Sequence, residues 1–255
     1  MRERKRKVVN IISLIFLVVG VGLLLYPVVA DWWNQIHQSY AIASYVKAVE
    51  KEEADYDAMK REAVKYNQEL VKKENRWHWS GAEKRHYYQL LSVGEKGTEN
   101  GILGYLSIPR IDVSLPIYHG TEESVLQTAA GHMQGTSLPV GGDTTHCVLS
   151  GHTGLPSSKL FTDIDQMEEG DIFTIRVLDE VMTYEVDRIL VVKPQEMEGV
   201  AFEEGQEYCT LLTCTPYGIN THRLLVRGHR VKNQEKQMKK YNLLPDRSDC
   251  AKLYR

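Results

Sequence analysis

A single uncharged and mostly apolar run lies near the N-terminus of the chain. Residues 8–30 carry no charged side chain, and this length matches the roughly 20 residues that an α-helix needs to cross the hydrocarbon core of a bilayer. Trp32 and Trp33 follow the run almost directly, at the level where interfacial aromatic residues gather. The pattern predicts one transmembrane helix over residues 8–30.

A cleavable signal peptide is the alternative, because basic residues precede the run. The core of a signal peptide is about 7 to 15 residues long and ends in small residues, whereas this run is longer and leads into Asp31 and two tryptophans. An uncleaved anchor is therefore favoured. By the positive-inside rule, the five basic residues among positions 1–7 predict a cytoplasmic tail and a single-pass protein of the cell membrane, whose remaining chain is extracytoplasmic.

Residues 31–100 have the composition of an extracytoplasmic helical region. Between positions 28 and 80 there is no Gly or Pro, and residue types that favour helix are frequent. A coiled coil fits the apolar stripe in this region, but a helix or a pair of helices packed on the following domain is the more frequent cause. Residues 75–81 break the pattern with two tryptophans, and residues 94–101 predict a polar linker. The stripe consists of Ile42, Tyr45, Val49, Tyr56, Met59, Ala63, Tyr66 and Leu70.

Residues 101–232 change to a strand pattern. Short runs rich in Val, Ile, Leu, Tyr and Thr alternate with Pro and Gly clusters, and they predict a mainly β domain, a barrel or a sandwich, as the globular core. The final stretch, residues 233–255, is a polar tail. The predicted strands cover residues 104–108, 115–120, 146–152, 171–177, 182–192, 208–214 and 222–230.

The charge balance narrows the choice of partners. The whole chain has a net charge of −3, and positions 1–7 contribute +4, so the remainder carries −7. An acidic exterior argues against nucleic acid as a partner. The basic N-terminal positions face the inner leaflet, where anionic membrane lipid accounts for them.

The cysteines suggest neither a disulfide framework nor a metal site. They are few for the length of the chain, and no pair has the C-x-x-C spacing of a zinc ligand set. No metal and no other cofactor is expected. Two of them lie in apolar runs, where a cysteine is most often a small buried hydrophobic residue. The four are Cys147, Cys209, Cys214 and Cys250.

Cys214 differs from the others because it ends its apolar strand next to a Pro and Gly loop. Alternation along the strand places Leu212 and Cys214 on one face and Cys209 and Thr213 on the other, so Cys209 and Cys214 are unsuited to a disulfide. At a strand end the backbone turns away and a substrate can approach. A cysteine acts as a nucleophile only as its thiolate, so such a site also needs a cationic or proton-accepting neighbour.

His152 is the best placed of the nine histidines to be that neighbour. It follows a predicted strand in a turn flanked by glycines, although a lone histidine in a turn is more often a solvent-facing polar residue. His222 is closer to Cys214 in sequence, but alternation turns the two to opposite faces. Arg223 opens the next strand, and its permanently charged guanidinium can donate to a carbonyl or an oxyanion. Taken alone, such an arginine is more often a surface charge.

These residues together resemble the signature of the sortases, membrane-anchored cysteine transpeptidases of Gram-positive bacteria. The family motif T-L-x-T-C is matched in full by residues 210–214. The upstream histidine of the family matches His152, and the arginine on the strand after the cysteine matches Arg223. The resemblance covers roughly residues 66–230. Finer detail resembles class C, the pilin-polymerising branch, at residues 100–105, 108–111, 115–120, 135–139 and 215–222.

The resemblance implies an eight-stranded β-barrel with an N-terminal helical extension. It implies acyl transfer at Cys214, which would attack the Thr–Gly bond of an LPXTG-like sorting signal. His152 would pair with the thiolate and protonate the leaving amine. Arg223 would hold the substrate and stabilise the oxyanion, with Leu212 and Thr213 beside the substrate. In class C, the ε-amine of a lysine on the next pilin subunit resolves the thioacyl enzyme and forms an isopeptide-linked polymer.

Two features typical of class C have no counterpart in this sequence. The class C lid carries an Asp-Pro-aromatic anchor over the cysteine, and no Asp-Pro occurs here. Trp77 or Trp79, within residues 75–81, is therefore expected to cap the cysteine instead. Many class C members also have a second membrane segment after the barrel, where this chain has the polar tail.

Two other functions stay open. A sortase that attaches surface proteins or finished pili to the cell wall would use a peptidoglycan precursor as its acceptor, and the motif does not distinguish it from a pilin polymerase. A non-catalytic, membrane-tethered scaffold would use the helical stripe to assemble partners. The combination of Cys214, His152 and Arg223 disfavours the scaffold.

Overall fold

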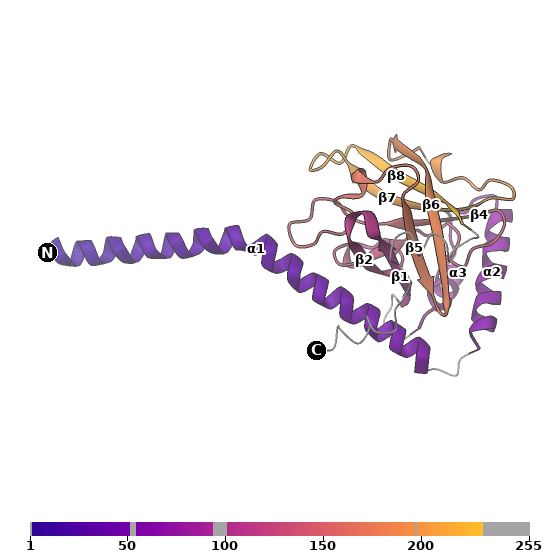
Figure 1. The fold of residues 1–255 in the computed structure, drawn as a ribbon, viewed down its shortest axis with the longest axis horizontal. Helices are drawn as coiled ribbons and strands as arrows, with labels where there is room; N and C mark the ends of the chain where they lie inside the picture. The colour runs from indigo at the N-terminus through magenta and orange to yellow at the C-terminus, as the bar shows by residue number, and fades with distance from the viewer. Residues whose placement is uncertain (1, 52–54, 94–100, 197, 232–255) are drawn as a thin grey trace.

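The computed structural model describes residues 2–51, 55–93, 101–196 and 198–231. Its main body is a closed β-barrel, from which one long helix extends (Figure 1). Most of the predicted linker at residues 94–101 and the whole predicted tail at residues 233–255 lie outside the described residues.

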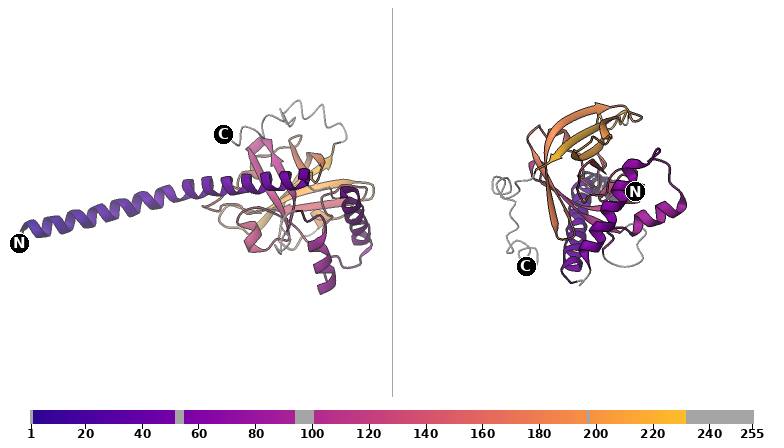
Figure 2. Two further views of the ribbon diagram at one scale, coloured as in Figure 1. Left: turned by 90° about the horizontal axis from the view of Figure 1, so that it is seen from below. Right: turned by 90° about the vertical axis from the view of Figure 1, so that its right-hand side faces the viewer.

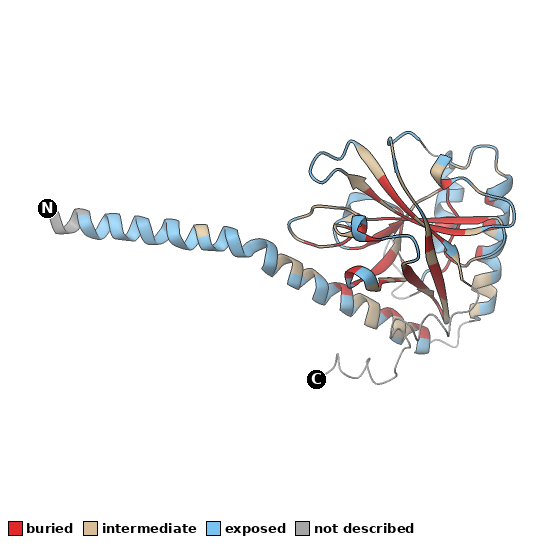
Figure 3. Cartoon of the chain, turned by 45° about the horizontal axis from the view of Figure 1, so that its top comes forward, coloured by how far each residue is buried: buried red, intermediate tan, exposed pale blue. Residues whose placement is uncertain are grey.

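Helix α1 (Arg2–Lys51) joins the apolar N-terminal run to the barrel. Its N-terminal half projects away from the barrel, and the apolar side chains of this half are exposed (Figure 3). The helix is long and apolar enough to cross a membrane. So large an apolar surface is unfavourable in water and fits the interior of a bilayer, as the run over residues 8–30 predicts.

The C-terminal half of α1 runs along the barrel and contacts strands β1 (Ile102–Ile108) and β2 (Val113–His119) (Figure 2). Tyr45 is buried in this contact. Its hydroxyl donates to the Leu103 carbonyl at 3.0 Å and accepts from the Leu178 N–H at 2.7 Å. Because the hydroxyl has both a donor and an acceptor, the aromatic ring is buried without leaving a polar group unpaired.

The predicted apolar stripe is divided between two helices. It runs along α1 as far as Val49 and continues on α2 (Tyr56–Lys72) with buried residues such as Ala63. A new helix begins there because the Asp55 carboxylate caps it, accepting from the Ala58 N–H at 2.8 Å. The stripe therefore belongs to a pair of helices packed on the barrel. A third helix, α3 (Gly81–Gln89), begins with a capping box.

Eight strands close the barrel in the order β1-β2-β3-β4-β7-β8-β6-β5. Seven of them correspond to the seven predicted runs, and the three-residue β3 was not predicted. Most neighbouring strands are antiparallel, but β2 with β3 and β4 with β7 are parallel. The remaining strands are β3 (Ala130–His132), β4 (Thr145–Ser150), β5 (Ile172–Val177), β6 (Glu180–Val192), β7 (Glu207–Thr215) and β8 (His222–Arg230). The connections contain α4 (Glu123–Leu126), η1 (Pro109–Ile111), η2 (Ile164–Gln166) and η3 (Glu198–Val200).

Part of the barrel wall is apolar on both faces. The inner face carries Leu211 and Val226, which belong to the main core. The outer face carries Leu212 and Leu225, which pack with Val200 of the β6–β7 connection in a second, smaller cluster. Strands that are covered on both sides carry apolar residues at successive positions, as Leu211 and Leu212 of β7 do.

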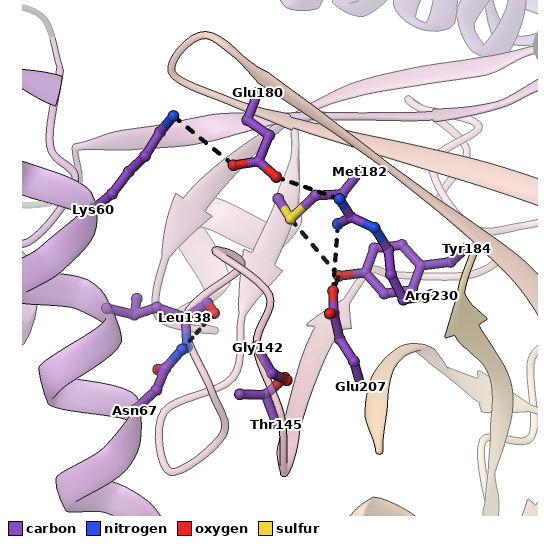
Figure 4. A network of polar contacts seen from close by, with 10 residues as sticks. All are labelled: Lys60, Asn67, Leu138, Gly142, Thr145, Glu180, Met182, Tyr184, Glu207 and Arg230. Atoms are coloured by element: carbon purple, nitrogen blue, oxygen red, sulfur yellow. Dashed lines mark hydrogen bonds and ion pairs between the residues drawn. The ribbon is translucent and has the colours of Figure 1, made fainter. Parts of the chain in front are cut away.

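A polar network ties α2 to one end of the barrel (Figure 4). Lys60 of α2 lies 3.8 Å from the carboxylate of Glu180, which pairs with Arg230 at 3.3 Å. Arg230 also pairs with Glu207 at 3.3 Å, and the Tyr184 hydroxyl donates to Glu207 at 3.2 Å. Glu207 is the first residue of β7 and Arg230 the last of β8, so this network lies at the end of the barrel opposite Cys214.

Asn67 provides a test of how α2 is attached. Its side chain accepts from the Leu138 N–H at 2.8 Å and donates to the Leu138 carbonyl at 3.1 Å, and both residues are buried (Figure 4). Asn67→Ala leaves both backbone groups unpaired, which should cost about 3 kcal/mol of unfolding free energy. Thermal unfolding should show a melting temperature about 8 °C lower. The exposed neighbour substitution Gln68→Ala is the control, and equal melting temperatures for the two variants would contradict the expectation.

Candidate active site

Cys214 and His152 reach the same end of the barrel because β4 and β7 run parallel. The register pairs Ser150 with Leu212. His152 lies two residues beyond Ser150, and Cys214 lies two residues beyond Leu212. The pairing continues past the end of β4, since the Gly151 N–H donates to the Leu212 carbonyl at 3.0 Å. The predicted nucleophile and its predicted partner therefore lie at the same edge of the sheet.

Arg223 lies directly opposite Cys214 on the neighbouring strand β8. Opposite residues of an antiparallel pair share a face, and their Cβ atoms are about 4.5 to 5.5 Å apart. The Arg223 guanidinium donates through Nη1 to the carbonyls of Asn220 and His222, at 3.2 and 3.0 Å. The register pairs His222 with Thr215, which turns His222 to the other face, as alternation predicts.

His152 contacts an acidic residue that the sequence did not point to. Its Nε2 lies 3.2 Å from the carboxylate of Glu123, the first residue of α4. A hydrogen bond from Gln127, together with the contact to His152, lowers the pKa of the Glu123 carboxyl below its usual range. Glu123 precedes His152 by 29 positions, and no spacing pattern links the two residues. The carboxylate is an exposed partner that can orient the imidazole.

The β7–β8 loop packs on the turn that carries His152. Gly154 has a positive φ of 76°, and a Cβ at this position would come within 2.8 Å of the Tyr217 ring. Glycine both permits this backbone conformation and leaves room for the ring. The loop is nevertheless largely open to solvent, since Tyr217 is 67% exposed and Ile219 is 68% exposed. Two large apolar side chains are thus available at the surface in the loop that follows Cys214.

Leu212 and Thr213 lie on different faces of β7. Leu212 shares the face of Cys214 and is half-buried at the edge of the outer cluster. Thr213 is buried on the other face, and its hydroxyl donates to the Gly151 carbonyl at 2.7 Å. Thr213 therefore fastens β7 to the turn of His152, and Leu212 is the one of the pair that borders the site.

The two tryptophans of residues 75–81 contact other parts of the molecule. The Trp77 ring packs against Gly135. The Arg76 guanidinium lies over this ring, with its Cζ 4.6 Å from the ring centroid. Trp79 packs on the main core, and its indole N–H donates to the Arg76 carbonyl at 2.6 Å. These contacts do not bring either tryptophan beside Cys214. The cap over the cysteine stays a prediction.

Two other cysteines face each other inside the barrel. The register pairs Cys147 with Cys209, and both are buried free thiols. Burial raises the pKa of Cys209 well above its ordinary value, which opposes thiolate formation. Both behave as small residues of the core, while Cys214 is partly exposed at the strand end. Cys250 lies outside the described residues.

His146 supports the outer face of the wall on which Cys214 lies. Its Nδ1 is 2.8 Å from the Ala201 carbonyl, and its Nε2 is 2.7 Å from the Thr210 hydroxyl. A neutral imidazole suits both contacts, because one nitrogen donates to the carbonyl and the other accepts from the hydroxyl. Burial lowers the pKa of His146 to about 4. This histidine holds the β6–β7 connection against β4 and β7.

Comparison with known proteins agrees with this geometry. Residues 106–231 match the family described as Sortase domain. The crystal structure of sortase C1 from Streptococcus agalactiae is 47% identical with a TM-score of 0.72, and the match covers 76% of this chain and 100% of that chain. Clostridium perfringens sortase C, solved with the C-terminal cell wall sorting motif, is 39% identical with a TM-score of 0.66, and the match covers 76% of this chain and 99% of that chain. Sortase A of Streptococcus agalactiae serotype III (strain NEM316) is 28% identical over 149 residues, which span 57% of this chain and 60% of that relative.

The fold and the site define a closed β-barrel with a thiol, an imidazole and a guanidinium at one end. With the similarities above, the chain belongs to the sortase family, whose members are cysteine transpeptidases. Its structural neighbours include class C sortases. The eight-stranded barrel that the sequence resemblance implied is confirmed.

The pKa of His146 predicts how stability depends on pH. Below about pH 6.5 the unfolded chain binds a proton at this histidine, while the folded chain stays neutral there until about pH 4. Stability should therefore fall as the pH decreases through this window, by about 3 kcal/mol from this group. Denaturant unfolding at about pH 7 and pH 4.5 should show a smaller loss for His146→Gln than for the wild type.

His119 is a second buried histidine of this kind, since burial lowers its pKa to about 4 as well. His146→Gln should therefore remove only part of the pH dependence. The exposed substitution His229→Gln is the matched control and should leave the loss unchanged. Equal losses in the wild type and in His146→Gln would contradict this account of His146.

Proposed function

We propose that the chain is a membrane-anchored class C sortase that cleaves an LPXTG-like sorting signal and joins it to a lysine amine of a pilin subunit. The observation that carries this proposal is the convergence of three side chains at one end of the barrel. The parallel β4–β7 register brings His152 to the level of Cys214, and the antiparallel β7–β8 register sets Arg223 opposite Cys214.

The proposed reaction has two acyl transfers. The Cys214 thiolate adds to the carbonyl carbon of the signal's threonine, and the C–N bond to glycine breaks as a proton from His152 goes to the leaving amine. The Arg223 guanidinium stabilises the oxyanion of each tetrahedral intermediate. A lysine ε-amine then attacks the thioester and gives a proton to His152. The isopeptide bond forms and the thiolate is released.

The apolar surface around Cys214 suits the apolar part of such a signal. Leu212 borders the cysteine on the same face, and Tyr217 and Ile219 are exposed in the adjoining loop. Leucine and proline side chains of a bound signal would cover these residues and remove apolar surface from water. Clostridium perfringens sortase C was solved with the C-terminal cell wall sorting motif, which supports the assignment of this class of substrate.

The proposed function also includes an acceptor amine and a membrane topology. A pilin lysine is preferred because the similar structures include sortase C1 of Streptococcus agalactiae, at 47% identity. Attachment of surface proteins to the cell wall is the second candidate, because Sortase A of the same species also matches the chain. The basic N-terminal positions favour a cytoplasmic N-terminus and a barrel outside the membrane.

Pilin polymerisation is tested by incubating the chain with pilin subunits that carry the sorting signal. The wild type should yield a ladder of oligomers that resists denaturing electrophoresis, because isopeptide bonds are covalent. Cys214→Ala should abolish the ladder, since no thioester can form. Cys209→Ala is the matched thiol control and should keep it. Cleavage of the signal without a ladder would exclude the pilin acceptor and leave attachment to the cell wall.

Labelling of the cysteine separates catalysis from a scaffold role. A thiol-directed probe should modify Cys214 faster than Cys250, because the proposed function makes Cys214 the nucleophile. Equal labelling rates together with no cleavage of a sorting-signal peptide would overturn catalysis and favour a non-catalytic scaffold.

Arg223 is tested by the kinetics of peptide cleavage. Arg223→Ala should lower kcat by about 100-fold or more, as the loss of an oxyanion donor does in other acyl-transfer sites. Arg223→Lys should recover only part of the loss, because an ammonium keeps the charge but lacks the planar set of donors. Arg188, which is exposed on β6, provides the control, and Arg188→Ala should stay within about twofold of wild type. Equal kcat values for Arg223→Ala and Arg188→Ala would exclude the proposed role.

A further inference from the structure

The part of α1 that follows the apolar run contacts the loop that begins at His152. Asp31, Asn34 and Gln38 are less exposed than the residues between them. They are three and four positions apart, so they share one face of the helix. This face meets the tip of the loop over residues 152–161.

Two of the contacts hold the loop tip through its backbone. The Asp31 carboxylate accepts from the Lys159 N–H at 2.8 Å. The Asn34 side chain donates to the Ser157 carbonyl at 2.7 Å. Hydrogen bonds to the main chain fix the path of a loop whatever its side chains are, so α1 sets the position of residues 157–159.

Gln38 bonds to two segments at once, the residues after α4 and the loop that begins at His152. Its buried amide donates to the Thr128 carbonyl at 2.8 Å and to the Ser158 hydroxyl at 3.3 Å. Ser158 belongs to the loop of His152. Thr128 follows α4, which carries Glu123, the carboxylate 3.2 Å from His152. One side chain of α1 thus joins the two segments that place His152 and its acidic partner.

The loop transmits this position to His152 because it is closed at its base. The Phe161 N–H donates to the His152 carbonyl at 3.0 Å, and the Gly154 N–H donates to the Thr162 hydroxyl at 3.1 Å. Loops whose ends lie close together are compact, and these two bonds couple the rest of this loop to its base. A displacement of the tip at residues 157–159 therefore displaces the turn that carries the imidazole.

We propose that Gln38, assisted by Asn34 and Asp31, is a positioning residue that sets His152 for reaction with the substrate. The membrane-anchoring helix is then part of the active site's support as well as its tether. The inference rests on the proposed catalytic role of His152. It assigns a function to the juxtamembrane polar residues of α1, which touch neither the substrate nor Cys214.

The test uses the full-length chain in detergent micelles and a peptide that contains an LPXTG sequence. Gln38→Met keeps the length of the side chain and its packing but removes both donors. We expect kcat to fall about 10- to 100-fold with KM within about twofold, because misplacing a reacting group by about 1 Å costs up to about 100-fold in rate. Gln68→Met, at an exposed glutamine of α2, is the control and should match the wild type.

A double-mutant cycle with His152 distinguishes positioning from general support of the fold. Thioester formation at Cys214 is followed by mass spectrometry in the His152→Ala background. Gln38→Met should cause no further loss there, because residues that act through one group are not additive. The same loss in both backgrounds, or a lower melting temperature with unchanged kcat, would show a structural tether and overturn the inference.

The outcomes also separate this inference from the proposed function. A wild-type chain that forms no thioester overturns the proposed function and the inference together. A wild-type chain that forms it, with Gln38→Met equal to it, overturns the inference alone. Asn34→Leu is the second variant should Gln38→Met not fold. It removes the donor to Ser157 at a partly exposed position and should lower kcat in the same direction with KM unchanged.

Discussion

The parallel pairing of β4 with β7 is the constraint on which the site depends. In a parallel pair both strands end at the same edge, so the turn after β4 and the end of β7 meet. Side chains alternate along each strand, and a slip of one residue would move Cys214 from the outer face to the interior. The buried pair of Cys147 and Cys209 and the apolar residues around it hold this register. The position of the nucleophile is therefore set by the core.

The two ends of the barrel are stabilised in different ways. At the end where β7 begins, charged residues of α2, β6, β7 and β8 pair with one another, as in the contact between Arg230 and Glu207 (Figure 4). At the end where β7 finishes, Arg223 donates to neutral carbonyls. Among the described residues no carboxylate pairs with this guanidinium, which can therefore respond to charge that develops on a substrate. The neutral partners of Arg223 thus suit the role proposed for it.

Much of the fold follows from patterns that the sequence displays directly. Runs of apolar residues between turns predicted seven strands, and the T-L-x-T-C motif located the nucleophile. Strand β3 was missed because three residues are too few to show a period. The contacts of Glu123, Tyr217 and Gln38 could not be predicted from the sequence, for a different reason. Each meets the turn or loop of His152 across tens of residues of sequence, 29 for Glu123, and such contacts depend on how the loops close in three dimensions.

The face of α1 that meets the barrel is apolar far from the N-terminal apolar run and polar close to it. Tyr45 and Val49, far from the apolar run, are buried in the core. Asn34, near the run, bonds instead to the loop of His152. It lies four residues beyond the predicted span, a rise of about 6 Å along the helix. The tip of the loop that begins at His152 is therefore held next to the end of the predicted span, so the same helix that carries the apolar run also fixes the position of this loop.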